Sequence, residues 1–230
     1  MPYSQCRTTH SKGCRRMPLR SLAIVSLLGS TALFIASAHA DADRDTIKFT
    51  VLRNDNEIGT NTITVSRSGD QTTVQIVTHV KVKFAFVTLY QFDQSDTKQW
   101  IGDQLVTLRA STDDNGTIHQ TTAQNNEGKM IVQGDGQITE LAASILPVSL
   151  WNFDVLKHST GFDPQSGSMV PISVVDRGVD DLMLLGHTEP AHHYVLTTTF
   201  PEDLWYDDNH RLVKLELKGP DGSTIRYQLN

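Results

Sequence analysis

Apolar and polar residues alternate along most of the chain after residue 44, with the period of two that is typical of β-strands. In residues 45–53, one face carries Ile47, Phe49 and Val51. In residues 72–84, we expect the apolar face to continue from Val74 to Phe84. The same alternation recurs in residues 62–67, 213–218 and 224–229. One apolar and one polar face per strand is typical of antiparallel sheets, and the sequence therefore predicts such a sheet.

Short segments rich in glycine, asparagine and aspartate separate these stretches. They include residues 54–56, 68–70, 113–116, 127–128, 134–136, 207–209 and 221–222. These residue types tolerate the positive φ that tight hairpins require. We therefore predict a mainly β fold: a single curved antiparallel sheet, or half-open barrel, that forms one domain over residues 41–230.

The middle of the chain has a different pattern. Residues 141–158 are the best helical candidate, with Ser149 as the cap of a short helix that runs through Lys157. Leu150 and Phe153 lie near helical spacing within it. We expect this one short central helix to lie across the concave side of the sheet.

Residues 1–40 have the order of a secretory signal peptide. Basic residues precede an apolar run at residues 21–37, and the small-residue sequence Ala38-His39-Ala40 follows. We predict a helical signal peptide cleaved after Ala40, and hence a periplasmic protein with no stable membrane span after cleavage. An uncleaved membrane anchor is the alternative, although serines and glycine dilute the run. The sequence leaves two alternatives open. Translation starts at Met1 or at Met17, and export uses the general or the twin-arginine pathway.

Charge and cysteine content exclude some classes of function. Residues 41–230 hold 15 basic and 26 acidic residues, a net charge of −11. Such an acidic surface disfavours nucleic acid, because phosphate binding needs basic side chains. Both cysteines, Cys6 and Cys14, precede the predicted cleavage site. The processed chain would therefore have no disulfide and no thiolate nucleophile.

The histidines and the candidate nucleophiles do not form a convincing catalytic pattern. Adjacent residues of a strand point to opposite faces, so His192 and His193 could not easily share a metal ion. Ser95 and Lys98 have the S-x-x-K spacing of some acyl-enzymes, but that chemistry needs both on one face of a helix. We predict no catalytic residues, no metal and no cofactor, and hence no enzyme.

Five aromatic residues are candidates for binding an apolar ligand: Trp151, Phe153, Trp100, Tyr90 and Trp205. Pockets for apolar ligands are lined by such side chains. The alternative is that they fill the core.

Several motifs carry a resemblance to a known family. They are residues 98–105, 111–116, 150–152, 204–207, 212–215 and 221–229, together with Gly59. On these motifs the chain resembles an uncharacterised family of exported proteobacterial proteins, the domain-of-unknown-function family six-one-three-four. The resemblance covers nearly all of residues 45–230 and implies no known activity. More distantly, the chain is similar to lipoprotein carriers of the LolA type, in which a half-open barrel encloses a cavity for acyl chains.

Three functions follow from these observations. The first is a non-enzymatic periplasmic protein that binds or carries an apolar, lipid-like ligand in the concave face of the sheet. The second is an envelope protein with a fully packed core that interacts with a protein partner or has a structural role. The third, a hydrolase, rests only on the abundant carboxylates and histidines.

Overall fold

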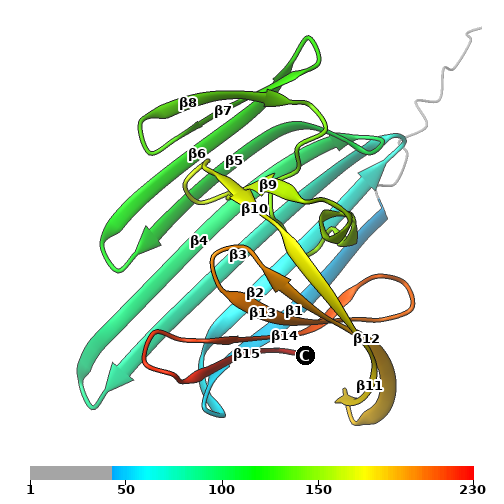
Figure 1. Ribbon diagram of the computed structural model, residues 1–230. Coiled ribbons are helices and arrows are strands. Elements are labelled where there is room, and N and C mark those ends of the chain that lie inside the picture. The colour runs from blue at the N-terminus through cyan, green and yellow to red at the C-terminus, as the bar shows by residue number, and fades with distance from the viewer. Residues whose placement is uncertain (1–42) are drawn as a thin grey trace, which may run out of the picture. The chain divides into compact units, whose positions relative to one another are not determined.

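The structure is a computed structural model that describes residues 43–230, and the predicted signal peptide at residues 1–40 lies outside them. The described chain is mainly β (Figure 1). Its strands are β1 (Asp43–Arg53), β2 (Asn56–Ser68), β3 (Gln71–Phe84), β4 (Val87–Ile101), β5 (Gln104–Asp114), β6 (Thr117–Asn126), β7 (Lys129–Gly134), β8 (Gln137–Ala142), β9 (Thr160–Phe162), β10 (Met169–Pro171), β11 (Ser173–Leu184), β12 (His187–Thr197), β13 (Pro201–Tyr206), β14 (Leu212–Lys218) and β15 (Thr224–Leu229).

Thirteen of these strands form one antiparallel sheet in the order β11-β12-β13-β14-β15-β1-β2-β3-β4-β5-β6-β7-β8. The first and last described strands, β1 and β15, pair with each other in the middle of the sheet. β11 and β8 are its two edges, so the sheet is not closed into a barrel. The remaining two strands, β9 and β10, pair with each other in a separate two-stranded sheet. The prediction of a mainly β fold with one large antiparallel sheet is confirmed.

The alternation of residues explains the burial in each strand. In β1, Ile47, Phe49 and Val51 are buried, whereas Lys48 between them is exposed. The turns carry the residues that hairpins demand. Asn115 and Gly116 both have positive φ, at 52° and 92°, and join β5 to β6 without strain.

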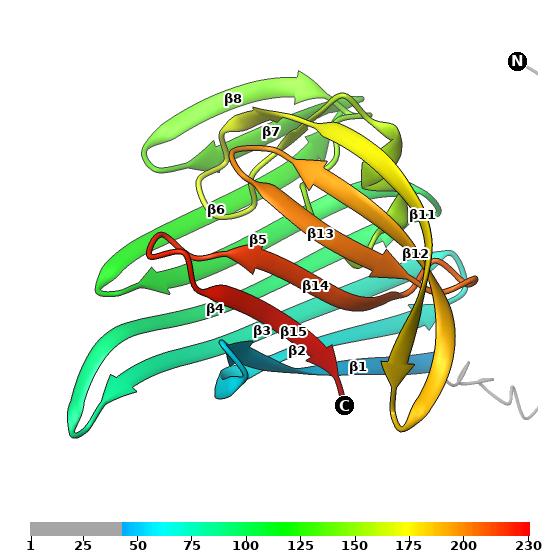
Figure 2. The same cartoon turned by 60° about the horizontal axis from the view of Figure 1, so that its bottom comes forward.

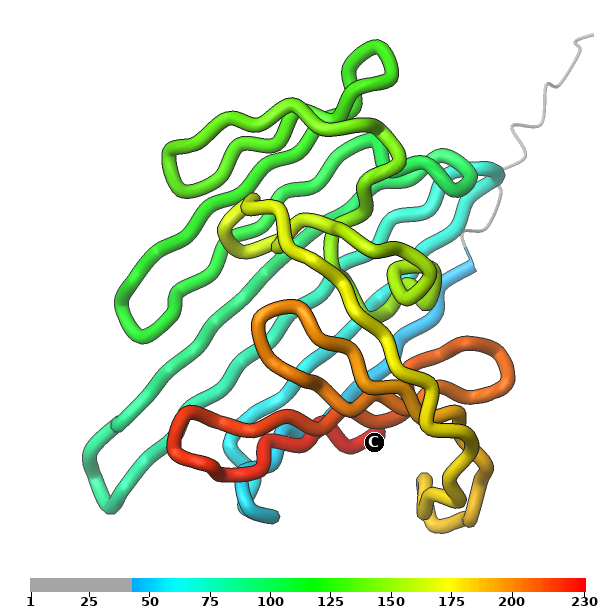
Figure 3. The backbone as a smooth tube through the Cα atoms, viewed as in Figure 1, coloured from blue at the N-terminus to red at the C-terminus, as the bar shows by residue number. Residues whose placement is uncertain are grey.

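The core lies between the two halves of the curled sheet (Figure 2). One half contributes Phe49, Val74 and Leu108, and the other contributes Leu204 and Leu215. Residues 143–172 cross the concave face between the halves (Figure 3). They bury Leu146, Val155, Phe162 and Ile172 in the same core. The concave face is therefore covered by the chain itself.

The predicted helix at residues 149–157 is wrong in type and length. Residues 43–230 contain no α-helix, and the only regular turn in this segment is the 3₁₀ helix η1 (Phe153–Lys157). Its cap is Asn152, not Ser149, because Asn152 Oδ1 accepts from the Asp154 N–H at 3.1 Å. Four residues before this cap, the Val148 N–H donates to the Phe162 carbonyl at 2.8 Å. This long-range pairing holds the backbone extended and overrides the weak helical spacing.

The apolar face predicted for β3 ends earlier than expected. Val74, Ile76 and Val80 are buried, but Phe84 is 75% exposed. The reason is that residues beyond Val80 have no partner in β2, whose register with β3 ends at the pair Gly59–Val80.

Among the described residues, no helix has the length and apolar character to span a membrane.

Candidate functional site

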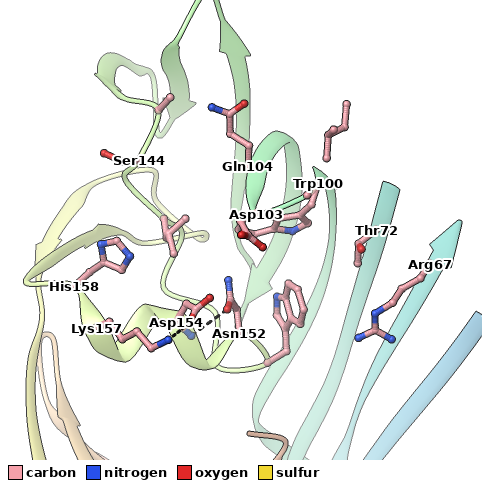
Figure 4. Close-up of a pocket in the computed structure, with 15 residues that line it drawn as sticks. Arg67, Thr72, Trp100, Asp103, Gln104, Ser144, Asn152, Asp154, Lys157 and His158 are labelled. Carbon is pink, nitrogen blue, oxygen red and sulfur yellow. Dashed lines mark hydrogen bonds and ion pairs between the residues drawn. The ribbon is translucent and has the colours of Figure 1, made fainter. Parts of the chain in front are cut away.

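A groove of about 820 Å³ opens at one end of the sheet, where the β2–β3 and β4–β5 turns meet residues 143–158 (Figure 4). β4 and β5 contribute the residues around the turn at Gly102 and Asp103, and the crossing segment contributes the facing wall. The lining residues are Arg67, Thr72, Trp100, Ile101, Gly102, Asp103, Gln104, Ala143, Ser144, Leu146, Trp151, Asn152, Asp154, Lys157 and His158.

Two tryptophans form the apolar part of this groove. Trp100 lies on the inner face of β4 and is 4% exposed, while Trp151 belongs to the crossing segment. Their ring centroids are 5.9 Å apart at an interplanar angle of 75°. This edge-to-face geometry stabilises an aromatic pair by about 0.5–1.5 kcal/mol beyond its buried area. Neither buried indole N–H has an acceptor among the described residues. The pair therefore joins the crossing segment to the sheet through packing.

Charged residues of both signs line the rim of the groove. Lys157 donates to Asp154 Oδ1 at 2.5 Å on the exposed side of η1. Arg67 at the end of β2 and Asp103 in the β4–β5 turn are also exposed. The groove thus combines an apolar wall with two cationic and two anionic side chains.

A buried ion pair lies next to Trp100 along β4. Asp96, Lys98 and Trp100 are two residues apart and share the inner face of the strand. Lys98 is completely buried, and its ammonium donates to Asp96 Oδ2 at 2.6 Å. Asp96 Oδ1 has no partner within residues 43–230. Burial raises the pKa of Asp96 and lowers the pKa of Lys98, while their mutual attraction opposes both shifts.

In the sequence, Lys98 has the S-x-x-K spacing from Ser95 and begins the family motif at residues 98–105. The structure places Ser95 on the exposed face and Lys98 on the buried face of β4, so the two side chains point apart. The signal that could have identified Lys98 as a core residue is its position midway between Asp96 and Trp100 in an alternating strand.

The five aromatic candidates do not form one site. The structure brings Trp100 and Trp151 together at the groove. Phe153 instead packs in the core, with its ring 5.1 Å from Tyr206 and stacked on His210 at 4.1 Å. Its role is therefore to fix η1 on the sheet.

Tyr90 and Trp205 lie elsewhere. Tyr90 is ten residues before Trp100 in β4, about 30 Å away along an extended strand. Its hydroxyl donates to Asp114 at 2.8 Å, and burial together with that carboxylate raises its pKa. Trp205 packs with Ala191 and Val213 in a separate cluster on the other face of the sheet.

The histidine cluster also separates in space. His192 and His193 are adjacent in β12 and contact different carboxylates. His193 stacks on Trp205 and lies 2.8 Å from Asp203. No group of three histidine, aspartate or glutamate side chains in the described part of the chain could hold a metal ion.

Fold and groove together define the class: an open, curled antiparallel sheet whose concave face is crossed by its own chain. Within that class, the family model "Domain of unknown function (DUF6134)" matches residues 49–230. The chain belongs to this family, as its motifs predicted. No curated protein matches the chain. The similarity to lipoprotein carriers stays a prediction.

Proposed function

We propose that the processed chain is a non-enzymatic periplasmic protein that binds an amphipathic, lipid-like ligand in the groove beside Trp100 and Trp151. The observation that carries this proposal is the groove itself, with its aromatic wall and charged rim. Its volume of about 820 Å³ lies within the range of small-molecule pockets.

The groove is a better place for the ligand than the middle of the concave face. Side chains of the crossing segment, among them Val155 and Phe162, already occupy that face. The groove lies at the end of the same face, where Trp100 and Leu146 reach the surface of the core. An acyl chain would lie against these apolar side chains and gain about 0.8 kcal/mol for each buried methylene.

The rim supplies the polar half of the site. Arg67 and Lys157 offer cationic groups to an acidic head group, and Asp103 offers a carboxylate to a cationic one. A carboxylate or phosphate head group can bind Arg67 through two parallel hydrogen bonds. A fatty acid is therefore a suitable first probe.

Export rests on residues 1–40 and has its own test. The charged, apolar and small-residue regions follow each other in the order that signal peptidases recognise. Mass spectrometry of the chain from a periplasmic extract should give an N-terminus at Asp41. Recovery of the uncleaved chain from the membrane fraction would contradict this part of the proposal.

A packed core favours a second candidate, an envelope protein that binds a protein partner. The described core is continuous between the two halves of the sheet and the crossing segment. That function needs no small molecule in the groove, so the two candidates make opposite predictions for ligand binding.

Native mass spectrometry of the processed chain, followed by titration with a fluorescent long-chain fatty acid, separates these candidates. We expect binding, and Trp151→Ala should weaken it about 10-fold or more, the loss of about 1.4 kcal/mol of apolar contact. Arg67→Glu should weaken it as well. Arg109→Glu is the matched control, because Arg109 is exposed on β5 outside the groove. No adduct and no uptake of the fatty acid would overturn the proposal and favour a protein partner.

A further inference from the structure

The tip of the β3–β4 hairpin is apolar and exposed. Phe86 is fully exposed, and Phe84 is 75% exposed. Val87 and Leu89 are also more than half exposed. Four large apolar side chains thus lie within six residues at one end of the sheet. An exposed apolar cluster of this kind marks an interaction site.

The hairpin extends beyond both neighbouring strands (Figure 1). Pairing of β3 with β2 ends at Val80, and pairing of β4 with β5 ends at Phe92. The Gln91 carbonyl still accepts from the Asn115 N–H at 2.8 Å. Residues 82–90 therefore form a two-stranded ribbon that projects about 15 Å from the sheet. An isolated two-stranded hairpin is marginally stable in water. The projection of this ribbon beyond its neighbouring strands therefore indicates that its tip has a function.

The turn residues set this hairpin apart from its neighbours. Eight turns of two residues join strands within residues 43–230, and seven of them contain glycine or asparagine. The turn between β3 and β4 is Ala85-Phe86, and Ala85 has a φ of 51°. Such positions favour glycine or asparagine, so alanine at position 85 carries a cost in local conformation.

The charge of the tip is opposite to that of the rest of the chain. Residues 80–92 contain Lys81 and Lys83 and no acidic residue. Residues 41–230 as a whole have a net charge of −11. The next acidic residue along β4 is Asp93, whose Oδ1 atom lies 2.6 Å from His79 Nδ1. An apolar tip flanked by lysines is complementary to an anionic lipid surface, because phenylalanine enters the acyl boundary while lysine remains at the head groups.

We infer that the β3–β4 hairpin docks the protein on a membrane by inserting Phe84 and Phe86 into an anionic lipid surface. The projection of about 15 Å exceeds the head-group layer of one leaflet, about 6 Å. The groove lies at the other end of β4, about 50 Å from the tip along the strand. A docked molecule would therefore hold its groove away from the bilayer. This inference is independent of what the groove binds.

The test uses the processed chain, recovered from the periplasm, and vesicles of about three parts phosphatidylcholine to one part phosphatidylglycerol. We expect binding at low salt that weakens at about 500 mM salt, where charges are screened. Phe84→Ser/Phe86→Ser should lower the partition coefficient about 100-fold. Lys81→Glu/Lys83→Glu should lower it about 30-fold on these vesicles and leave weak binding to pure phosphatidylcholine unchanged.

Two further variants separate insertion from general effects. Ile138→Ser/Phe200→Ser removes two other exposed apolar side chains and should bind like the wild type. Phe86→Trp should show a blue-shifted tryptophan emission on vesicles that the wild type lacks. Because both tip residues are exposed, the serine variants should melt at the wild-type temperature.

Three outcomes would overturn the inference. The first is a wild-type chain that does not bind these vesicles at low salt. The second is a serine tip variant that binds as well as the wild type. The third is a wild-type dimer in solution that the serine tip variant abolishes, which would show that a second copy covers the tip.

Discussion

Replacement of Lys98 by methionine should strongly destabilise the fold. Lys98 is completely buried, and within residues 43–230 its only charged partner is Asp96, which is 4% exposed. Lys98→Met keeps most of the side-chain volume but leaves the Asp96 carboxylate in the core without a counter-charge. Loss of one member of a buried ion pair costs about 3–5 kcal/mol. Domains of this size have unfolding free energies of about 5–15 kcal/mol, so the effect is a large share.

The cost should depend on pH in a defined direction. Burial already raises the pKa of Asp96 in the wild type, and removal of the ammonium raises that pKa further. The folded variant then holds a proton that the unfolded chain has released. Its unfolding free energy therefore falls as the pH rises, by at most about 1.4 kcal/mol per pH unit. The destabilisation should be largest near pH 8 and shrink toward about pH 4, the ordinary pKa of aspartate.

Urea unfolding of the processed chain at about pH 5 and pH 8 measures both effects. The matched control is Asp96→Val/Lys98→Met, which removes the pair and leaves no buried charge. This double variant should be as stable as the wild type, or more stable by about 1–4 kcal/mol. A Lys98→Met chain with wild-type stability at pH 8, or with the same loss at both pH values, would refute the reasoning.

Three further variants test other contacts. Gly134→Ala should cost about 1–3 kcal/mol in urea unfolding, because a Cβ there would lie 2.2 Å from the Ser166 carbonyl oxygen of the crossing segment; wild-type stability would contradict this packing. Tyr206→Phe should cost about 1–2 kcal/mol in the same assay, because the buried hydroxyl donates to the Leu150 carbonyl at 2.9 Å. Burial raises the pKa of Glu202 to about 7, so its contribution to stability is full below its ordinary pKa and is lost as the pH rises through 7. Glu202→Gln should flatten the measured pH dependence of unfolding between about pH 5 and pH 8, and an unchanged slope would count against it.

The strands and their turns could be predicted because their signals are local. In β1 the alternation of Phe49 and Val51 with polar residues reports directly which face is buried. Turns such as Asn115-Gly116 need a positive φ that few residues tolerate. Such signals do not specify which strands pair over long distances. The contact of β1 with β15 joins residues that are about 180 positions apart, and nothing in either strand alone indicates it.

The crossing segment shows where local spacing misleads. Leu150 and Phe153 are spaced as in a helix, yet backbone hydrogen bonds that join Phe162 to Val148 and Leu146 hold the preceding residues extended. The candidate site was also predictable only in part. The sequence identifies its tryptophans, but their contact depends on how distant segments pack. Trp100 and Trp151 meet only because the crossing segment folds back on β4, whereas Trp205 resembles them in sequence and lies on the other face.

A crystal structure of the processed chain grown with a saturating long-chain fatty acid tests the central proposal most directly. The account predicts density for the acyl chain against Trp100 and Trp151, with the carboxylate close to Arg67 or Lys157. An empty groove, or density on the opposite face around Trp205, would contradict it.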